Sequence, residues 1–136
     1  MTNLNIQKIK SDKTMKGWGW EEVLINRYEF CGKILHYDKP NSISSYHFHP
    51  NKREYFRCVA GSFILLQKDR FGKDHEMVLR VGDSVYISNN VPHQLISLEH
   101  NSEIYEISTY HSDDDVVRIS PGDSQRSFLS VILKPC

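Results

Sequence analysis

The sequence predicts one all-β domain, an antiparallel β-barrel or jelly roll, from three observations. Short apolar or alternating runs recur roughly every ten residues after Glu22. Turn-forming residues such as Lys39-Pro40-Asn41 and Val81-Gly82-Asp83 separate these runs. No segment shows a convincing apolar pattern at helical spacing. Short strands at this spacing are typical of antiparallel sandwiches and barrels.

The elements are expected in a simple order along the chain. Residues 1–20 form a polar N-terminal arm ending in Trp18-Gly19-Trp20, whose aromatic side chains should hold it against the core. Residues 21–136 form the barrel domain. Its strands are predicted at residues 22–30, 33–37, 44–48, 54–59, 62–68, 75–80, 84–87, 93–98, 103–110, 116–119 and 127–133. Because a small barrel has edges to cover, we expect a homodimer in which the arm packs across the partner.

Composition excludes several classes of protein. The 136 residues carry 17 basic and 17 acidic side chains, so no net charge favours nucleic acid or an anionic membrane. No stretch approaches the ~18 apolar residues of a membrane span, and the N-terminus lacks the layout of a secretory signal. The three cysteines form no CxxC motif. We therefore expect a cytoplasmic protein with reduced thiols.

A histidine cluster is the most informative feature of the sequence. His47 and His49 stand two residues apart on a predicted strand, so their side chains point to the same face. The loop after Pro50 turns the chain back, and Glu54 then opens the next strand. A carboxylate at that position can approach the two imidazoles. An isolated His-x-His pair is usually just two strand histidines, but Glu54 and a further histidine favour a site.

The further histidine is His93, which a strand, a tight turn and Pro92 bring to the start of another strand. Three neutral imidazoles and one carboxylate suit a divalent first-row metal ion. His47, His49, Glu54 and His93 are therefore the predicted ligands of one ion of Zn, Mn, Fe, Ni or Co.

These segments resemble the two sequence motifs of the cupins. His47-Phe48-His49, Glu54 and Gly61 match the first motif from its histidines onward, with Asn41 in place of its leading glycine. Gly82 and His93 match the second motif, which departs at Ser88, Asn90 and Ser97. Asn90 is a mild departure from glycine, because asparagine tolerates left-handed backbone. The resemblance implies a cupin barrel with all four metal-ligand positions retained.

A further resemblance extends over roughly residues 17–120. Trp18-Gly19, the metal motifs and the acidic ending at Asp114-Asp115-Val116-Val117-Arg118 are similar to the cupin-type mannose-6-phosphate isomerases. This similarity implies a small-molecule substrate, either a sugar or a sugar phosphate.

Aldose–ketose isomerisation needs a Lewis acid and a base that moves a proton between two carbons. Glu106 is the first candidate for this base and His111 the second, and at most one of them faces the cavity from a regular strand. The remaining candidates are Tyr46 and Tyr86 as proton donors, and Lys52, Arg53 and Arg57 as phosphate ligands or solvated charges.

Three functional classes stay open on the sequence alone. They are a metal-dependent sugar or sugar-phosphate isomerase, a metal-dependent dioxygenase that uses Fe(II), and a non-catalytic module that binds a small ligand. The ligand set cannot separate them, because function depends on the pocket lining. Asp113-Asp114-Asp115 is expected to be a solvated turn, and Cys58 a small core residue.

Overall fold

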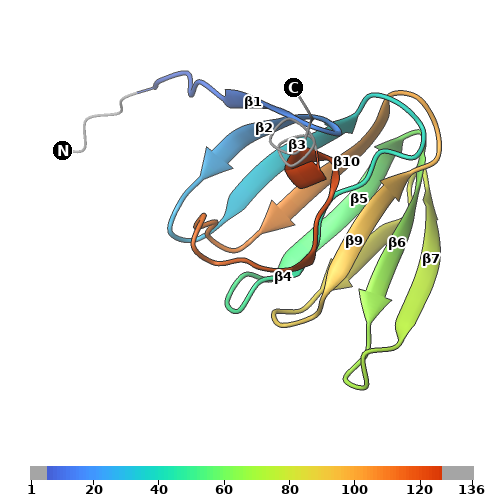
Figure 1. Cartoon of the computed structure of the whole chain (residues 1–136). Coiled ribbons are helices and arrows are strands. Elements are labelled where there is room, and N and C mark those ends of the chain that lie inside the picture. The colour runs from blue at the N-terminus through green and yellow to red at the C-terminus, as the bar shows by residue number, and fades with distance from the viewer. Residues whose placement is uncertain (1–5, 127–136) are drawn as a thin grey trace, which may run out of the picture.

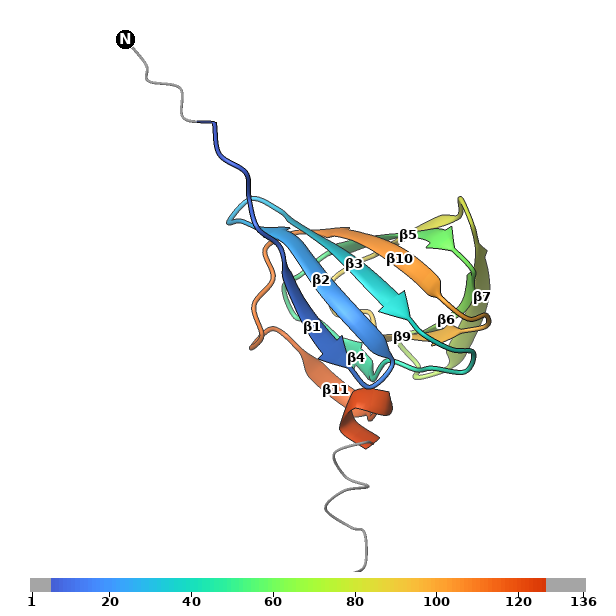
Figure 2. The same cartoon turned by 90° about the horizontal axis from the view of Figure 1, so that it is seen from above.

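The computed structural model describes residues 6–126, which form two antiparallel sheets facing each other as a barrel (Figures 1 and 2). One sheet has the strand order β1-β2-β3-β10-β5-β8 and the other β11-β4-β9-β6-β7. The strands are β1 (Asp12–Lys16), β2 (Gly19–Asn26), β3 (Cys31–Tyr37), β4 (Tyr46–Phe48), β5 (Glu54–Ala60), β6 (Ser62–Lys68), β7 (Asp74–Arg80), β8 (Ser84–Ile87), β9 (His93–Ser97), β10 (Ser102–Ser108) and β11 (Val117–Ser120). The predicted all-β barrel is therefore confirmed.

Alternation along the strands places the core between the sheets. In β3 every second residue is buried, from Cys31 to Tyr37, and β10 follows the same pattern. Alternate residues of a strand point to opposite faces, so each sheet turns one face inward. The shared core consists of Trp18, Leu35, Tyr37, Phe56, Cys58, Phe63, Leu65, Leu79, Ile87, Leu95 and Ile104. Cys58 is fully buried, as predicted for a small core residue.

Aromatic contacts join the N-terminal segment to this core. Trp18 stacks on Tyr37 with ring centroids 4.4 Å apart, and Tyr37 meets the edge of Phe63 at 5.1 Å. Such aromatic pairs stabilise a fold by about 0.5–1.5 kcal/mol beyond the area they bury. The expectation that an aromatic side chain anchors this segment is confirmed for Trp18.

Several strand ends differ from the predicted bounds by one or two residues, and larger differences occur at β1, β2 and β10. Strand β1 was not predicted, because its sequence is mostly polar and all its residues except Lys16 lie exposed at the edge of the sheet. Strand β2 begins at Gly19 and ends at Asn26, since Arg27 and Phe30 bond to each other across a tight turn. Strand β10 ends at Ser108, before the predicted residue 110. The predicted strand at 127–133 and Cys136 lie outside the described residues.

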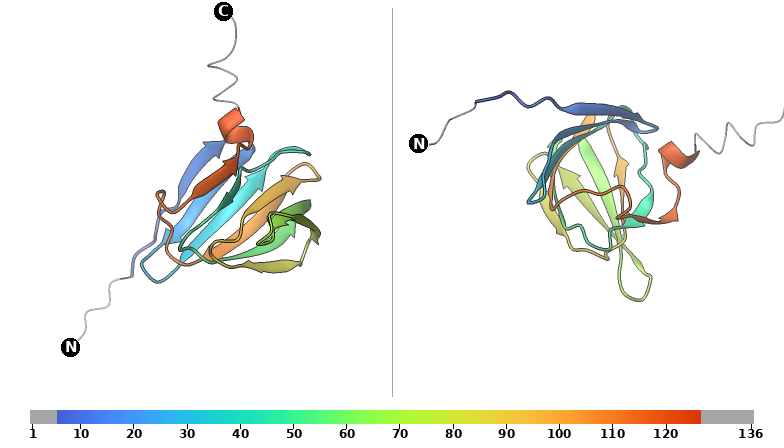
Figure 3. Two further views of the ribbon diagram at one scale, coloured as in Figure 1. Left: turned by 60° about the horizontal axis from the view of Figure 1, so that its bottom comes forward. Right: turned by 90° about the vertical axis from the view of Figure 1, so that its left-hand side faces the viewer.

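Two asparagines occupy left-handed backbone where the cupin motifs carry glycine. Asn41 has a φ of 61° and Asn90 a φ of 64°, values that asparagine adopts more readily than most residues. Both asparagines thus adopt a backbone conformation that glycine also favours. Figure 3 shows the chain running past the barrel into a short helical turn at residues 123–126. Across residues 6–126, no helix has the length and apolar character that a membrane span requires.

Candidate metal centre

Three short elements bring the predicted ligands together. His47 lies in β4 and pairs with His93, the first residue of β9, in the antiparallel register. His49 directly follows Phe48, the last residue of β4, and Glu54 is the first residue of β5. His49, Glu54 and His93 are buried, while His47 is half-buried at the cavity wall.

Backbone carbonyl groups fix the tautomer of all three histidines. The Nδ1 atoms of His47, His49 and His93 lie 2.8, 2.6 and 2.9 Å from the carbonyl oxygens of Ser45, Asp115 and Val91, respectively. A carbonyl oxygen can only accept, so each Nδ1 carries the proton and donates it. Each Nε2 then presents a lone pair. This arrangement is typical of metal-binding histidines, whose second nitrogen is held by an acceptor.

The free ligand atoms converge on one point. One nitrogen from each of the three imidazoles lies within 4.8 Å of the others. Glu54 places Oε1 2.6 Å from His49 Nε2 and Oε2 3.5 Å from His93 Nε2. Despite this proximity, Glu54 Oε1 and His93 Nε2 are buried without a hydrogen-bond partner among the described residues. Orphaned buried polar atoms are costly, and a cation between them would satisfy both. The cluster is thus able to hold one divalent metal ion.

Local electrostatics favour the same conclusion. Burial, followed by the neighbouring His93 and His49, lowers the pKa of His47 to about 3, so its imidazole is neutral at physiological pH. Burial alone would raise the pKa of Glu54, but its contacts with His49 and His93 hold that pKa well below the usual range. Burial would lower the pKa of His93, and Glu54 raises it instead. A carboxylate that stays charged beside three imidazoles suits a divalent cation.

The loop between β4 and β5 is held by Asp115. Its carboxylate accepts hydrogen bonds from the backbone amides of Asn51 and Lys52, at 2.9 and 2.8 Å, while its carbonyl oxygen receives the Nδ1 proton of His49. Asp115 is buried, so the expectation of a solvated turn was wrong for this residue. Sequence analysis missed its role because nothing distinguishes Asp115 from the two aspartates before it.

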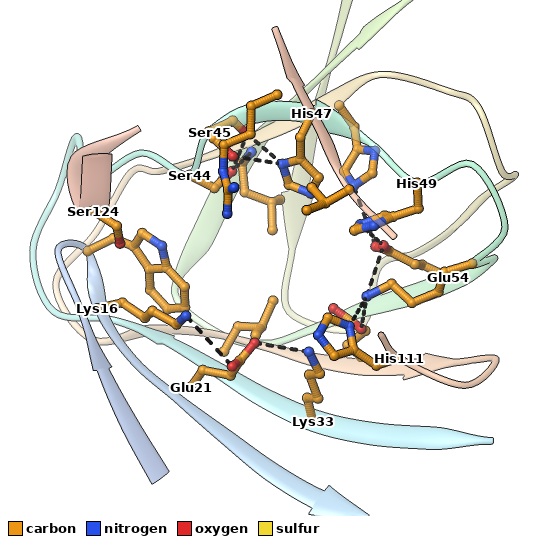
Figure 4. A pocket seen from close by; sticks show the side chains of 18 of the residues that line it. Lys16, Glu21, Lys33, Ser44, Ser45, His47, His49, Glu54, His111 and Ser124 are labelled. Atoms are coloured by element: carbon orange, nitrogen blue, oxygen red, sulfur yellow. Dashed lines mark hydrogen bonds and ion pairs between the residues drawn. The ribbon is translucent and has the colours of Figure 1, made fainter. Parts of the chain in front are cut away.

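The candidate ligands line a cavity of about 490 Å³ between the two sheets. Figure 4 shows His47, His49 and Glu54 on one side of this cavity and Lys16, Glu21 and Lys33 on the other. Leu35, Phe56 and Leu95 contribute apolar core surface to its wall. The cavity therefore combines the candidate metal centre with several charged side chains.

Both candidate bases line the cavity. Glu106 is buried in β10, and His111 reaches the cavity from the loop after that strand. The Nζ of Lys52 lies 3.3 Å from Glu106 Oε2 and 3.1 Å from His111 Nδ1. His111 Nε2 lies 3.0 Å from Asp113 Oδ1. Burial, then Lys33 and Lys52, lower the pKa of His111, so this imidazole is neutral at physiological pH.

Other sequence-predicted residues lie elsewhere. Tyr46 donates its hydroxyl proton to Asp74, 2.9 Å away, and Tyr86 is exposed, so neither lines the cavity. Arg53 and Arg57 are exposed as well. Lys52 was expected to be a phosphate ligand or a solvated charge, but it is a buried partner of Glu54 and Glu106.

Solved structures with a similar fold include oxalate decarboxylase from Bacillus subtilis. A tryptophan-to-phenylalanine variant shares 18% identity over 80% of this chain, with a TM-score of 0.72. The structure of that enzyme at pH 4.6 shares 15% over 93% of this chain, also with a TM-score of 0.72. A structure from work on its Mn(II) centres gives a TM-score of 0.71. The aligned part covers only 30% to 35% of those chains, so the likeness shows the fold.

Sequence comparisons show the family. A search among curated proteins finds no match to this sequence. A family model described as "Cupin domain" matches residues 35–104, just over half of the chain, and the matched segment includes all four predicted ligands. The chain belongs to the cupin family.

Proposed function

We propose that this cupin binds one divalent metal ion through His47, His49, Glu54 and His93 and acts on a sugar or sugar phosphate as an aldose–ketose isomerase. One observation carries the proposal. The converging histidine nitrogens and the buried carboxylate of Glu106 line the same cavity, connected through Lys52. An ion there would supply Lewis acidity toward a carbonyl or hydroxyl oxygen. Glu106 would supply the base.

Glu106 is better placed than His111 to move a proton. Both nitrogens of His111 are engaged, because Nδ1 accepts from the Lys52 ammonium and Nε2 donates to Asp113. Among the described contacts, Glu106 uses only Oε2, which accepts from Lys52. Its second oxygen can therefore accept a proton from a substrate carbon. The ammonium group of Lys52 would orient the Glu106 carboxylate and stabilise its charged form.

The size and the lining of the cavity support a sugar-sized substrate. A volume of about 490 Å³ lies within the ~300–1,000 Å³ of small-molecule sites. Hydroxyl groups need many hydrogen-bond partners, and the wall offers Ser44, Ser45 and Ser124 in addition to its charged groups. The similarity of residues 17–120 to cupin-type mannose-6-phosphate isomerases supports the same substrate class.

The test is turnover of free aldoses and sugar phosphates by the metal-loaded full chain. Glu106→Gln keeps the size of the side chain and removes the base, so it should lower kcat by about 10²–10⁴ while metal content stays unchanged. Glu103→Gln is the matched control, because Glu103 lies on the same strand but pairs with His36 and does not line the cavity. Unchanged turnover by metal-loaded Glu106→Gln would exclude Glu106 as the base.

A second candidate function follows from the donor set. Three histidines and a carboxylate also suit Fe(II) with positions left for oxygen. Metal analysis with an oxygen electrode separates the two functions. Iron with substrate-dependent oxygen uptake favours a dioxygenase, and turnover without oxygen uptake favours the isomerase. Metal and ligand binding without turnover of any sugar would favour a non-catalytic binding module.

We also propose that the protein acts in the cytoplasm as a homodimer. Cys31 and Cys58 are buried free thiols, which supports a reducing compartment. The exposed edge strand β1 supports a partner along that edge. A monomeric mass at micromolar concentration would contradict the dimer.

A further inference from the structure

Two buried lysines line the cavity, and their ammonium groups differ in how many protein partners they have. Lys52 Nζ bonds to Glu106 Oε2 at 3.3 Å and to His111 Nδ1 at 3.1 Å, and it lies 3.4 Å from Glu54 Oε1. An ammonium group has three N–H donors, so two donors of Lys52 are bonded to protein acceptors and the carboxylate of Glu54 neutralises its charge as an ion-pair partner. The protein itself therefore supplies the anionic partners of Lys52.

Lys33 is as deeply buried but has far fewer partners. Its side chain is 3% exposed, and its single hydrogen bond among the described residues runs to Glu21 Oε1, 3.1 Å away. Two of its three N–H donors therefore lack a protein acceptor. Leaving buried charged donors unpaired is costly. The position of Lys33 in the cavity wall means that a bound ligand could accept both.

The charges around Lys33 favour an anion. Glu21 is shared with Lys16, whose Nζ lies 4.0 Å from Glu21 Oε2, so two cations face one carboxylate. Arg118 lines the cavity too, but it is the register partner of His47 and so lies beside the candidate metal centre rather than beside Lys33. Figure 4 shows Lys16, Glu21 and Lys33 across the cavity from His47 and His49. This cationic side is therefore separate from the candidate metal centre.

We propose that Lys33, assisted by Lys16, binds the phosphate group of a substrate whose sugar oxygens face the metal centre. This inference rests on the proposed function and selects sugar phosphates over free sugars. It also places the phosphate contacts away from Lys52, Arg53 and Arg57, which the sequence left open as phosphate ligands or solvated charges. Cationic donors suit phosphate because its oxygens accept charge-assisted hydrogen bonds.

The experiment titrates inorganic phosphate into the full chain by calorimetry, once metal-loaded and once after chelation. Lys33→Met should weaken phosphate binding at least tenfold in both states. Lys13→Met is the matched control, because Lys13 shares β1 with Lys16 but lies over the Trp20 ring, 3.8 Å from its centroid, and this variant should bind phosphate normally. Acetate should bind more weakly than phosphate, since it has fewer acceptors.

Glu21→Gln keeps the inference testable if Lys33→Met fails to fold. It removes the carboxylate that competes for Lys33, so phosphate should bind more tightly by a few fold. Weaker binding by Glu21→Gln, unchanged binding by a folded Lys33→Met, or acetate binding equal to phosphate would overturn the subsite.

Measuring metal content in the same samples separates the two proposals. If the protein binds no metal but still binds phosphate through Lys33, the result would support the phosphate subsite and contradict the proposed function. Phosphate binding that is lost on chelation and insensitive to Lys33→Met would place the anion on the metal and overturn the subsite alone.

Discussion

His49 donates its Nδ1 proton to the backbone carbonyl of Asp115, 2.6 Å away, although 66 residues separate the two in the chain. The carboxylate of the same aspartate accepts from two amides of the loop that follows His49. One residue thus orients a candidate metal ligand and holds the loop that leads to Glu54. Such partners behind the ligands determine how well a site is preorganised.

Asp115→Ala should therefore weaken metal binding although Asp115 is not a ligand. The substitution leaves the amides of Asn51 and Lys52 without their acceptor and loosens the loop before Glu54. Loss of such a supporting contact typically costs about 10- to 100-fold in metal affinity. Competition with a chelating dye measures that affinity. Asp114→Ala, at an exposed neighbouring position, should leave it unchanged, and equal losses in both variants would contradict this role.

Glu21 should make the stability of the protein depend on pH in the acidic range. Burial raises the pKa of Glu21, but Lys33, Lys16 and His111 outweigh burial and lower it below the ordinary value of 4.5. A carboxyl with a depressed folded-state pKa stabilises the fold above the unfolded pKa and loses that contribution as pH falls through the folded value.

Urea denaturation at several pH values measures this effect. The wild type should exceed Glu21→Gln in stability at about pH 7, and the difference should shrink below about pH 4.5. A difference that stays constant across this range would show that Glu21 does not contribute through its charge.

Gly61 should tolerate no side chain in the turn between β5 and β6. Its φ is +64°, and a Cβ there would come within 2.1 Å of Ser102 Oγ and 2.8 Å of Ser102 Cα. Gly61→Ala should lower the free energy of unfolding by about 1–3 kcal/mol. Gly72→Ala tests the contribution of φ alone, because Gly72 has a φ of +80° and a Cβ there would meet no atom within 4 Å. Denaturant melts should show a smaller loss of unfolding free energy for Gly72→Ala than for Gly61→Ala. The difference between the two losses would measure the clash with Ser102.

The candidate ligands His47, His49 and Glu54 could be predicted from sequence because their geometry is local. Strand parity places His47 and His49 on one face, and the turn after Pro50 returns Glu54 toward them. The structure brings both histidines and Glu54 together with His93, at the positions that the two motifs suggested. The positions of most strands could also be predicted, because glycine, proline and asparagine favour turns at the strand ends.

The rest of the site depends on long-range contacts that no local pattern encodes. Lys52 appeared to be a loop cation, but it meets Glu106 across 54 residues of sequence. Lys33 meets Glu21 only because β2 and β3 are neighbours in the sheet. Strand β1 was missed because an exposed edge strand needs no apolar alternation. Charged residues on a cavity wall look like solvated surface residues until the fold is known.

Metal analysis of His49→Ala and His93→Ala by mass spectrometry, with His36→Ala and His100→Ala as matched controls, tests the central claim most directly. His36 bonds to Glu103 and stacks on Trp20, and neither it nor His100 belongs to the histidine cluster. We expect about one divalent ion per chain in the wild type and both controls, and loss of most of it in His49→Ala and His93→Ala. Full metal content in the last two variants, or equal losses in all four, would contradict the assignment of the metal centre.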